Sequence, residues 1–149
     1  MVIFFEFKSR LRFKIKFFLL DVESYKNDIK ITKSSEIIYG LRNFIGNANK
    51  FSYNEIKIIL RSNIKETEII IKDDGPGFPK DLINKSILGE PYIRSRDTQN
   101  LSKHGLGLGT FIGKTLLEKN FAKIIFKNSA NDNGAEVIIK WDNKDLRRI

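Results

Sequence analysis

The stretch that decides the fold class runs from Ser34 to Lys72 and reads SSEIIYGLRNFIGNANKFSYNEIKIILRSNIKETEIIIK. Its first half places apolar residues at helical spacing, and Ser34 or Ser35 can cap the start, which predicts a helix over about 35–50. Its second half carries two Ile-rich runs, Glu55–Arg61 and Glu68–Lys72, which predict an antiparallel hairpin. A helix beside a hairpin must bury its apolar face, so we expect it to cover one face of a sheet.

The segment before this stretch adds candidate strands. Leu11–Phe17 alternates apolar and basic residues with period two, which predicts a half-buried strand. Asn27–Thr32 is a shorter strand candidate with the same kind of alternation. We expect residues 1–33 to be an N-terminal strand segment and residues 34–149 to form one domain. The alternatives are an excised domain, the product of a truncated or split gene, which the first 20 residues favour, and a partner that acts in trans.

The segment after the hairpin predicts a loop, a helix and a second hairpin. Residues from about Lys85 to His104 lack periodicity and predict a long mobile loop. A helix is expected from Gly105 to Lys119, followed by strands over Ala122–Asn128 and Ala135–Trp141 with an Asn-Asp-Asn-Gly turn at 131–134. The buried side of that helix is predicted to consist of large apolar residues, namely Leu108, Phe111, Ile112, Leu116 and Leu117. The order of elements predicts an α+β two-layer sandwich, a mixed and mostly antiparallel sheet covered on one face by helices.

Composition excludes several classes of function. The chain has no cysteine and one histidine, His104, which excludes a disulfide framework, a cysteine-based zinc site and a multi-histidine metal site. No apolar run reaches the roughly 20 residues of a spanning helix, and charges interrupt the N-terminal apolar stretch, so we expect a soluble, cytoplasmic chain. The net charge of +9 is spread along the sequence, without a long basic block. It favours compositional drift together with a polyanionic ligand over nucleic acid or a membrane surface.

Two asparagines on the first helix are candidate ligands for a cation. Asn43 and Asn47 are four residues apart and therefore neighbours on one helix face, with Lys50 a turn further on. Amide oxygens can ligate Mg²⁺, which prefers hard oxygen donors, and a lysine can meet a phosphate as a point charge. Taken alone, the same pattern fits an ordinary solvated helix face.

The Asp73-Asp74-Gly75-Pro76-Gly77 segment ends the second strand of the hairpin. A carboxylate at that position can accept a hydrogen bond from the exocyclic amine of adenine, which guanine does not present at that ring position. The glycines let the backbone approach a flat ring. Taken alone, the segment fits a tight turn equally well.

The second predicted helix begins with a glycine-rich run. Gly105, Leu106, Gly107, Leu108, Gly109 and Thr110 combine close backbone approach with the unpaired N–H groups of a helix start, which suits phosphate. The preceding loop carries Arg94 and Arg96, which are candidates for a lid over a nucleotide. The spacing matches neither a dinucleotide-binding fingerprint nor a P-loop.

In this order and spacing the segments resemble the nucleotide-binding boxes of the histidine kinase, gyrase and heat-shock-chaperone ATPases, which share the Bergerat ATP-binding fold. Leu41–Ser52 resembles the N box, Asp73–Gly77 the G1 box and Gly105–Gly109 the G2 box. Leu88–Ile93 and Gly107–Glu118 further resemble the RegB/PrrB/ActS type of sensor histidine kinase. The resemblance covers about Ser35 to Trp141.

The resemblance implies a role for each matched residue. Asn47, with Asn43, would hold Mg²⁺, Lys50 would touch the phosphates, and Asp73 would bind the adenine amine of ATP. Gly75 and Gly77 would flank the ring, and Gly105, Gly107 and Gly109 would admit the phosphates. ATP-hydrolysing members of the superfamily resemble one another in having Glu where this chain has Asn43, whereas sensor histidine kinases have Asn.

The resemblance also implies partners. We expect phosphoryl transfer to a histidine on a dimerisation domain absent from this chain, or on a partner kinase chain in trans, and then to a response regulator; a membrane would be reached only through a missing sensor segment. No catalytic residue is expected within the chain, because His104 lies beside the G2 glycines and is a poor acceptor. The alternatives are a non-catalytic ATP-binding regulatory module or inactive kinase fragment and, without a recognised motif, a basic nucleic-acid-binding protein.

Overall fold

The computed structural model describes residues 17–24, 34–91, 108–130, 134–146 and 148. Within these residues the chain forms one five-stranded sheet in the order β1-β2-β3-β5-β4. Strand β1 runs parallel to β2, whereas the β2–β3, β3–β5 and β5–β4 pairs are antiparallel. The predicted mixed, mostly antiparallel sheet is therefore confirmed. The strands are β1 (Phe17–Ser24), β2 (Glu55–Ser62), β3 (Glu66–Asp73), β4 (Lys123–Asn128) and β5 (Ala135–Asp142).

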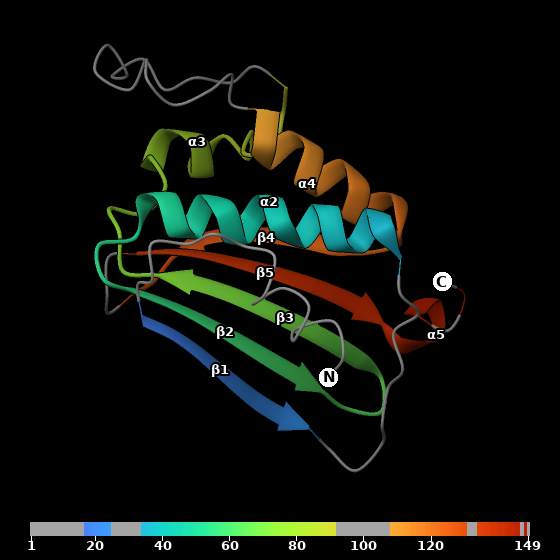
Figure 1. Ribbon diagram of the computed structural model, residues 1–149. Coiled ribbons are helices and arrows are strands. Elements are labelled where there is room, and N and C mark those ends of the chain that lie inside the picture. Colours follow the sequence, from blue (N-terminus) through green and yellow to red (C-terminus); the bar gives the residue numbers. More distant parts are fainter. Residues whose placement is uncertain (1–16, 25–33, 92–107, 131–133, 147, 149) are drawn as a thin grey trace.

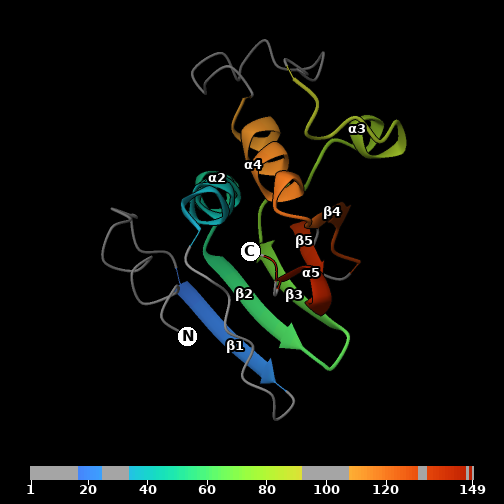
Figure 2. The ribbon, with the colours of Figure 1, turned by 90° about the vertical axis from the view of Figure 1, so that its right-hand side faces the viewer.

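Helices cover one face of this sheet. Helix α2 (Ser35–Phe51) lies along the strands, α4 (Leu108–Lys119) packs beside it, and the short α3 (Lys80–Asn84) lies on the same side (Figures 1 and 2). A last turn of helix, α5 (Asn143–Leu146), follows β5 at its end. The α+β two-layer sandwich is confirmed. Among the described helices, none has the length and apolar character required to cross a membrane.

The core lies between α2 and the sheet. The apolar residues of α2 that recur at helical spacing are buried, and they pack against Ile58, Ile69, Ile71 and Ile139 of the central strands. Strand side chains alternate between the two faces, so Asp73, which follows Ile69 and Ile71 with period two, belongs to the helix-covered face. The strand pattern therefore directs the carboxylate of Asp73 to the side on which α2 and α4 lie.

The predicted helix and hairpins of the central region are confirmed within a few residues. Helix α2 ends one residue later than predicted, and β2 and β3 extend the predicted hairpin to Ser62 and back to Glu66. The second predicted hairpin is present as the antiparallel β4–β5 pair. Its turn residues 131–133, residues 11–16 of the strand predicted over Leu11–Phe17, the strand candidate over Asn27–Thr32, and most of the predicted loop lie outside the described residues.

Three features differ from the sequence prediction. Strand β1 begins at Phe17, where the predicted strand ended, and α3 was not predicted. The prediction that Ile112 is buried is wrong, because 41% of its surface is exposed. Helix α4 meets α2 through Leu117, as predicted, and through Gly113, which was not predicted because a glycine contact gives no apolar signal in the sequence.

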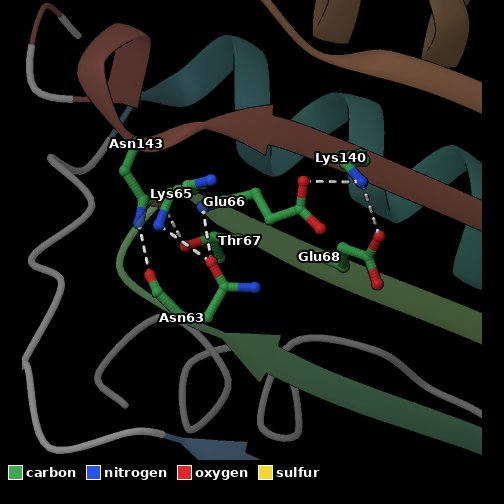
Figure 3. Close-up of polar contacts among 7 residues, drawn as sticks. All are labelled: Asn63, Lys65, Glu66, Thr67, Glu68, Lys140 and Asn143. Atoms are coloured by element: carbon green, nitrogen blue, oxygen red, sulfur yellow. Dashed lines mark hydrogen bonds and ion pairs between the residues drawn. The ribbon is translucent and has the colours of Figure 1, made fainter.

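A buried polar cluster closes the end of the sheet at the β2–β3 turn (Figure 3). The Thr67 hydroxyl donates to Asn143 Oδ1 at 2.8 Å, and the Asn143 amide donates to the Asn63 carbonyl at 2.6 Å. Ser62 adds a hydroxyl contact to Thr67 at 3.0 Å. The start of α5 is thereby attached to the hairpin at the end of β3 opposite Asp73, far from the candidate site.

Candidate nucleotide-binding site

The two candidate asparagines of α2 both use their amino groups for contacts with the protein. Asn43 Nδ2 donates to the Tyr39 carbonyl at 2.9 Å, one helical turn earlier. Asn47 Nδ2 donates to Thr110 Oγ1 of α4 at 3.1 Å. Since each amide has one donor end and one acceptor end, these bonds fix the orientation of both side chains, whose oxygens lie near Gly109 of α4. Neighbouring amide oxygens of this kind suit a hard cation such as Mg²⁺.

The start of α4 approaches these two amides closely because it carries glycine. A Cβ on Gly109 would lie 3.4 Å from Asn43 Oδ1 and 3.7 Å from Asn47 Oδ1. One turn later, a Cβ on Gly113 would lie 3.2 Å from the Asn43 Cβ and from the Gly40 carbonyl. A helix start presents unpaired backbone N–H groups, which favour anions. The structure thus brings Asn43, Asn47, Gly109 and Thr110 together, as the sequence predicted.

Asp73 is held at the end of β3 by backbone donors. Its Oδ1 accepts from the Gly75 N–H at 2.9 Å and from the Ala135 N–H of β5 at 3.2 Å. Gly134 passes so close to Asp73 that a Cβ there would collide with the Asp73 carbonyl. The carboxylate is therefore fixed in position by its own loop and by the neighbouring strand.

The glycines of the Asp73–Gly77 loop meet two different requirements. Gly75 is buried against the last turn of α2, where a Cβ would collide with the Phe51 carbonyl. Gly77 has φ +77°, in the left-handed region that glycine adopts without strain. The loop lies against the end of the helix that carries Asn43 and Asn47, so the first two predicted boxes are neighbours in the fold.

The far end of this loop is fixed by a residue that the sequence did not single out. The Asn128 side chain accepts from the Phe78 N–H at 2.7 Å and donates to the Phe78 carbonyl at 2.9 Å, as a neighbouring strand would. The Phe78 ring also contacts Phe126 edge to face, and Phe126 contacts Phe44 of α2 in the same way. Asp74, which fastens the same loop from its other end, is likewise not singled out by the sequence. Neither residue has a local pattern, because the partners are distant in the sequence.

The remaining predicted site residues divide into those that the structure describes and those that it does not. Lys50 is exposed in the last turn of α2, with its Nζ 5.3 Å from the centre of the Phe51 ring. Leu108 is the first residue of α4. Arg94, Arg96, Gly105, Leu106 and Gly107 lie outside the described residues.

Comparisons with known proteins identify the family of the chain. The family of histidine kinase-, DNA gyrase B- and HSP90-like ATPases matches residues 32–145. The sensor histidine kinase RegB of Cereibacter sphaeroides is 37% identical over 106 residues, which are 68% of this chain and 22% of RegB. An NtrY-like protein of Rickettsia prowazekii, named as a sensor histidine kinase, is 32% identical over 94 residues, which are 63% of this chain and 14% of that protein. The chain therefore spans less than a quarter of the length of these relatives.

Solved structures share the fold. The catalytic domain of the histidine kinase ThkA superimposes with a TM-score of 0.69 at 21% identity, over 95% of this chain and 90% of that domain. The mycobacterial sensor histidine kinase MprB gives a TM-score of 0.66 at 22% identity, over 84% of this chain and 83% of that one. With the family match over most of the sequence, the chain belongs to the histidine kinase-, DNA gyrase B- and HSP90-like ATPases and carries the nucleotide-binding domain of that family.

Proposed function

We propose that this chain is the ATP–Mg²⁺-binding catalytic domain of a two-component sensor histidine kinase. It would transfer the γ-phosphoryl group of ATP to a histidine on a dimerisation domain, from which a response regulator would receive the group. The observation that carries the proposal is the orientation of Asn43 and Asn47. Both amino groups are used by protein acceptors, and both oxygens lie near Gly109 at the start of α4, where they would meet a ligand.

Asn43 favours transfer to a histidine over hydrolysis. An amide does not take a proton at neutral pH, so Asn43 cannot serve as a general base toward water. A neutral imidazole is itself a nucleophile and needs less activation than water. In-line transfer then depends on how the site holds the phosphates, which is the main contribution of a protein to phosphoryl transfer.

The residues fit a magnesium ion held together with a triphosphate. Asn43 Oδ1 and Asn47 Oδ1 would be the protein ligands, and phosphate and water oxygens would complete the shell that Mg²⁺ prefers. The ion supplies charge neutralisation on the transferring group when it is bound. Thr110 accepts a hydrogen bond from the Asn47 amide, the start of α4 would face the phosphates, and Lys50 would add positive charge one turn along α2.

Asp73 would recognise the adenine base. Its carboxylate lies on the helix-covered face at the end of β3 and is fixed by two backbone N–H groups. An acceptor in that position selects an amino group over a carbonyl, and hence adenine over guanine. Gly75 and Gly77 would flank the ring, Gly105, Leu106, Gly107 and Leu108 would border the phosphates, and Arg94 and Arg96 would close over them.

The test is phosphotransfer in trans. The chain is incubated with γ-labelled ATP, Mg²⁺ and the separately purified dimerisation hairpin of the RegB relative. We expect label on the hairpin, none on a hairpin whose acceptor histidine is replaced by alanine, and none when the chain carries Asn47→Leu. Nucleotide binding without any transfer would refute the kinase assignment and support a regulatory ATP-binding module.

A further inference from the structure

Asp74 contacts three consecutive residues of the segment that leaves α2. Its Oδ1 accepts from the Tyr53 N–H at 2.8 Å and from the Asn54 N–H at 3.1 Å, and its Oδ2 accepts from the Asn54 N–H at 2.9 Å. Its own N–H donates to the Glu55 carbonyl at 3.3 Å. The loop that follows β3 is therefore fastened to the turn between α2 and β2.

The charge of this carboxylate is maintained at neutral pH. Burial opposes ionisation, but hydrogen bonds with the backbone of Glu55, Asn54 and Tyr53 outweigh it, so the pKa of Asp74 lies below its ordinary value. Hydrogen bonds to an ionised acceptor are shorter and stronger than those between neutral groups. The ionised carboxylate of Asp74 thus links the loop after β3 to the turn between α2 and β2.

The two sequence neighbours of Asp74 connect this link to the proposed adenine and phosphate subsites. Asp73, the residue before it, faces the base subsite, and its Oδ1 accepts from the N–H of Gly75. Gly75, the residue after it, packs against the Phe51 carbonyl at the end of α2. Phe51 follows Asn47 by one helical turn. Asp74 therefore lies between the residue assigned to adenine and the helix assigned to the phosphates.

We propose that Asp74 is a positioning residue that sets the spacing between the adenine and phosphate subsites. The inference depends on the proposed function, because it assigns one nucleotide to both subsites. A ligand that touches both subsites gains full affinity only when the distance between them is already correct. A ligand that touches one subsite does not depend on that distance.

The experiment compares two ligands and three variants. Mg-ATP would span both subsites, whereas adenosine would occupy the base subsite alone. Calorimetry measures the affinity for Mg-ATP, and NMR titration measures the affinity for adenosine. Asp74→Ala removes the hydrogen bonds of the carboxylate, and Asp74→Asn keeps an acceptor oxygen without the charge. Thr67→Val disturbs the polar cluster at the opposite end of β3 and serves as a control for general loss of stability.

We expect Asp74→Ala to weaken Mg-ATP about tenfold or more, as loss of a positioned charged contact does, with adenosine affected less than about threefold. Asp74→Asn should recover part of the Mg-ATP affinity, which also keeps the test open if the alanine variant does not fold. Thr67→Val should bind both ligands like the wild type.

Three results would overturn the inference while leaving nucleotide binding intact. The first is an unchanged Mg-ATP affinity in Asp74→Ala or, if that variant does not fold, in Asp74→Asn. The second is an equal loss of affinity for Mg-ATP and for adenosine in the Asp74 variant. The third is a similar loss of Mg-ATP affinity in Thr67→Val. If the wild-type chain binds neither ligand, the proposed function fails, and the inference fails with it.

Discussion

Asp73 shows how much can depend on one carboxylate in this fold. Its Oδ1 is used by Gly75 and Ala135, so the orientation of the side chain is set before any ligand arrives. An asparagine that keeps Oδ1 in place replaces the second oxygen by an amino group. That group cannot accept a hydrogen bond from the amine of adenine.

We expect Asp73→Asn to weaken ATP binding by about tenfold or more, because a hydrogen bond to a charged group is worth about 1.5–3 kcal/mol. Calorimetric titration measures the change. Asp81→Asn, at an exposed carboxylate in the first turn of α3, is the matched control and should bind as the wild type does. Equal affinities for wild type and Asp73→Asn would remove Asp73 from base recognition.

At the residue scale, the sequence predicts the residues proposed to contact the nucleotide better than the residues that hold the surrounding loop in place. Asn43, Asn47 and Asp73 follow from residue chemistry and spacing along one helix or at one strand end. Asp74 and Asn128 could not be found in this way, because they bind backbone groups 20 and 50 residues away in the sequence. A contact of that kind depends on the fold and leaves no local periodicity.

Elements are predicted well where periodicity is strong and local. Helix α2 and the β2–β3 hairpin follow directly from the apolar pattern of Ser34–Lys72. The packing face of α4 does not, because close approach to α2 uses glycine, whose contribution is the absence of a side chain. Gly40 illustrates this, since a Cβ there would lie 2.6 Å from the Leu117 Cγ.

Two glycines of α2 allow a matched test of this packing. Gly40→Ala should destabilise the protein by about 1–3 kcal/mol, because the fully buried Leu117 has no room to move. Gly46→Ala should instead be neutral or stabilising by up to about 1 kcal/mol, since nothing lies within 4 Å of its Cβ position and alanine favours a helix. Urea unfolding measures both changes. The packing argument is wrong if the two variants have the same stability.

The sheet carries a buried acidic residue with two basic neighbours. Glu136 of β5 pairs with Lys72 at 3.0 Å and with Lys127 at 3.1 Å, and its side chain is 6% exposed. Burial raises the pKa of Glu136, but the hydrogen bonds and charges of the two lysines outweigh burial and lower it from its ordinary value of 4.5. The folded protein therefore holds this proton less tightly than the unfolded chain does, and stability is lost as the pH falls below about 4.5.

We expect Glu136→Gln to lower the free energy of unfolding at pH 7 by about 1–3 kcal/mol, because two hydrogen bonds to a charged group lose their charge. The difference from wild type should shrink as the pH falls below about 4.5 towards the lowered pKa of Glu136, because the wild-type carboxylate becomes protonated over that range. Unfolding midpoints at pH 7 and pH 3 test this. Glu90→Gln, at a more exposed ion pair with Lys114, should change little at either pH. A deficit in Glu136→Gln that does not vary with pH would contradict the assignment.

For the whole molecule, the sequence predicts the fold class, but it does not give the order of the strands. The predicted order of helix, hairpin, loop, helix and hairpin implies a sheet that is covered on one face by helices. The insertion of β5 between β3 and β4, and the parallel pairing of β1 with β2, depend on contacts between segments that are distant in the sequence. The division into residues 1–33 and 34–149 stays a prediction, although β1, from the first part, pairs with β2 in the same sheet.

The central claim is that one helix face, one strand end and one glycine-rich helix start bind a single magnesium-chelated ATP. Calorimetric titration of the chain with ATP, in Mg²⁺ and in EDTA, tests it most directly, with Asn47→Leu measured in parallel. We expect one ATP per chain, bound several-fold more tightly with Mg²⁺, and loss of that difference in Asn47→Leu because a ligand oxygen is removed. No binding, or an ATP affinity that does not depend on Mg²⁺ in the wild type, would contradict the claim.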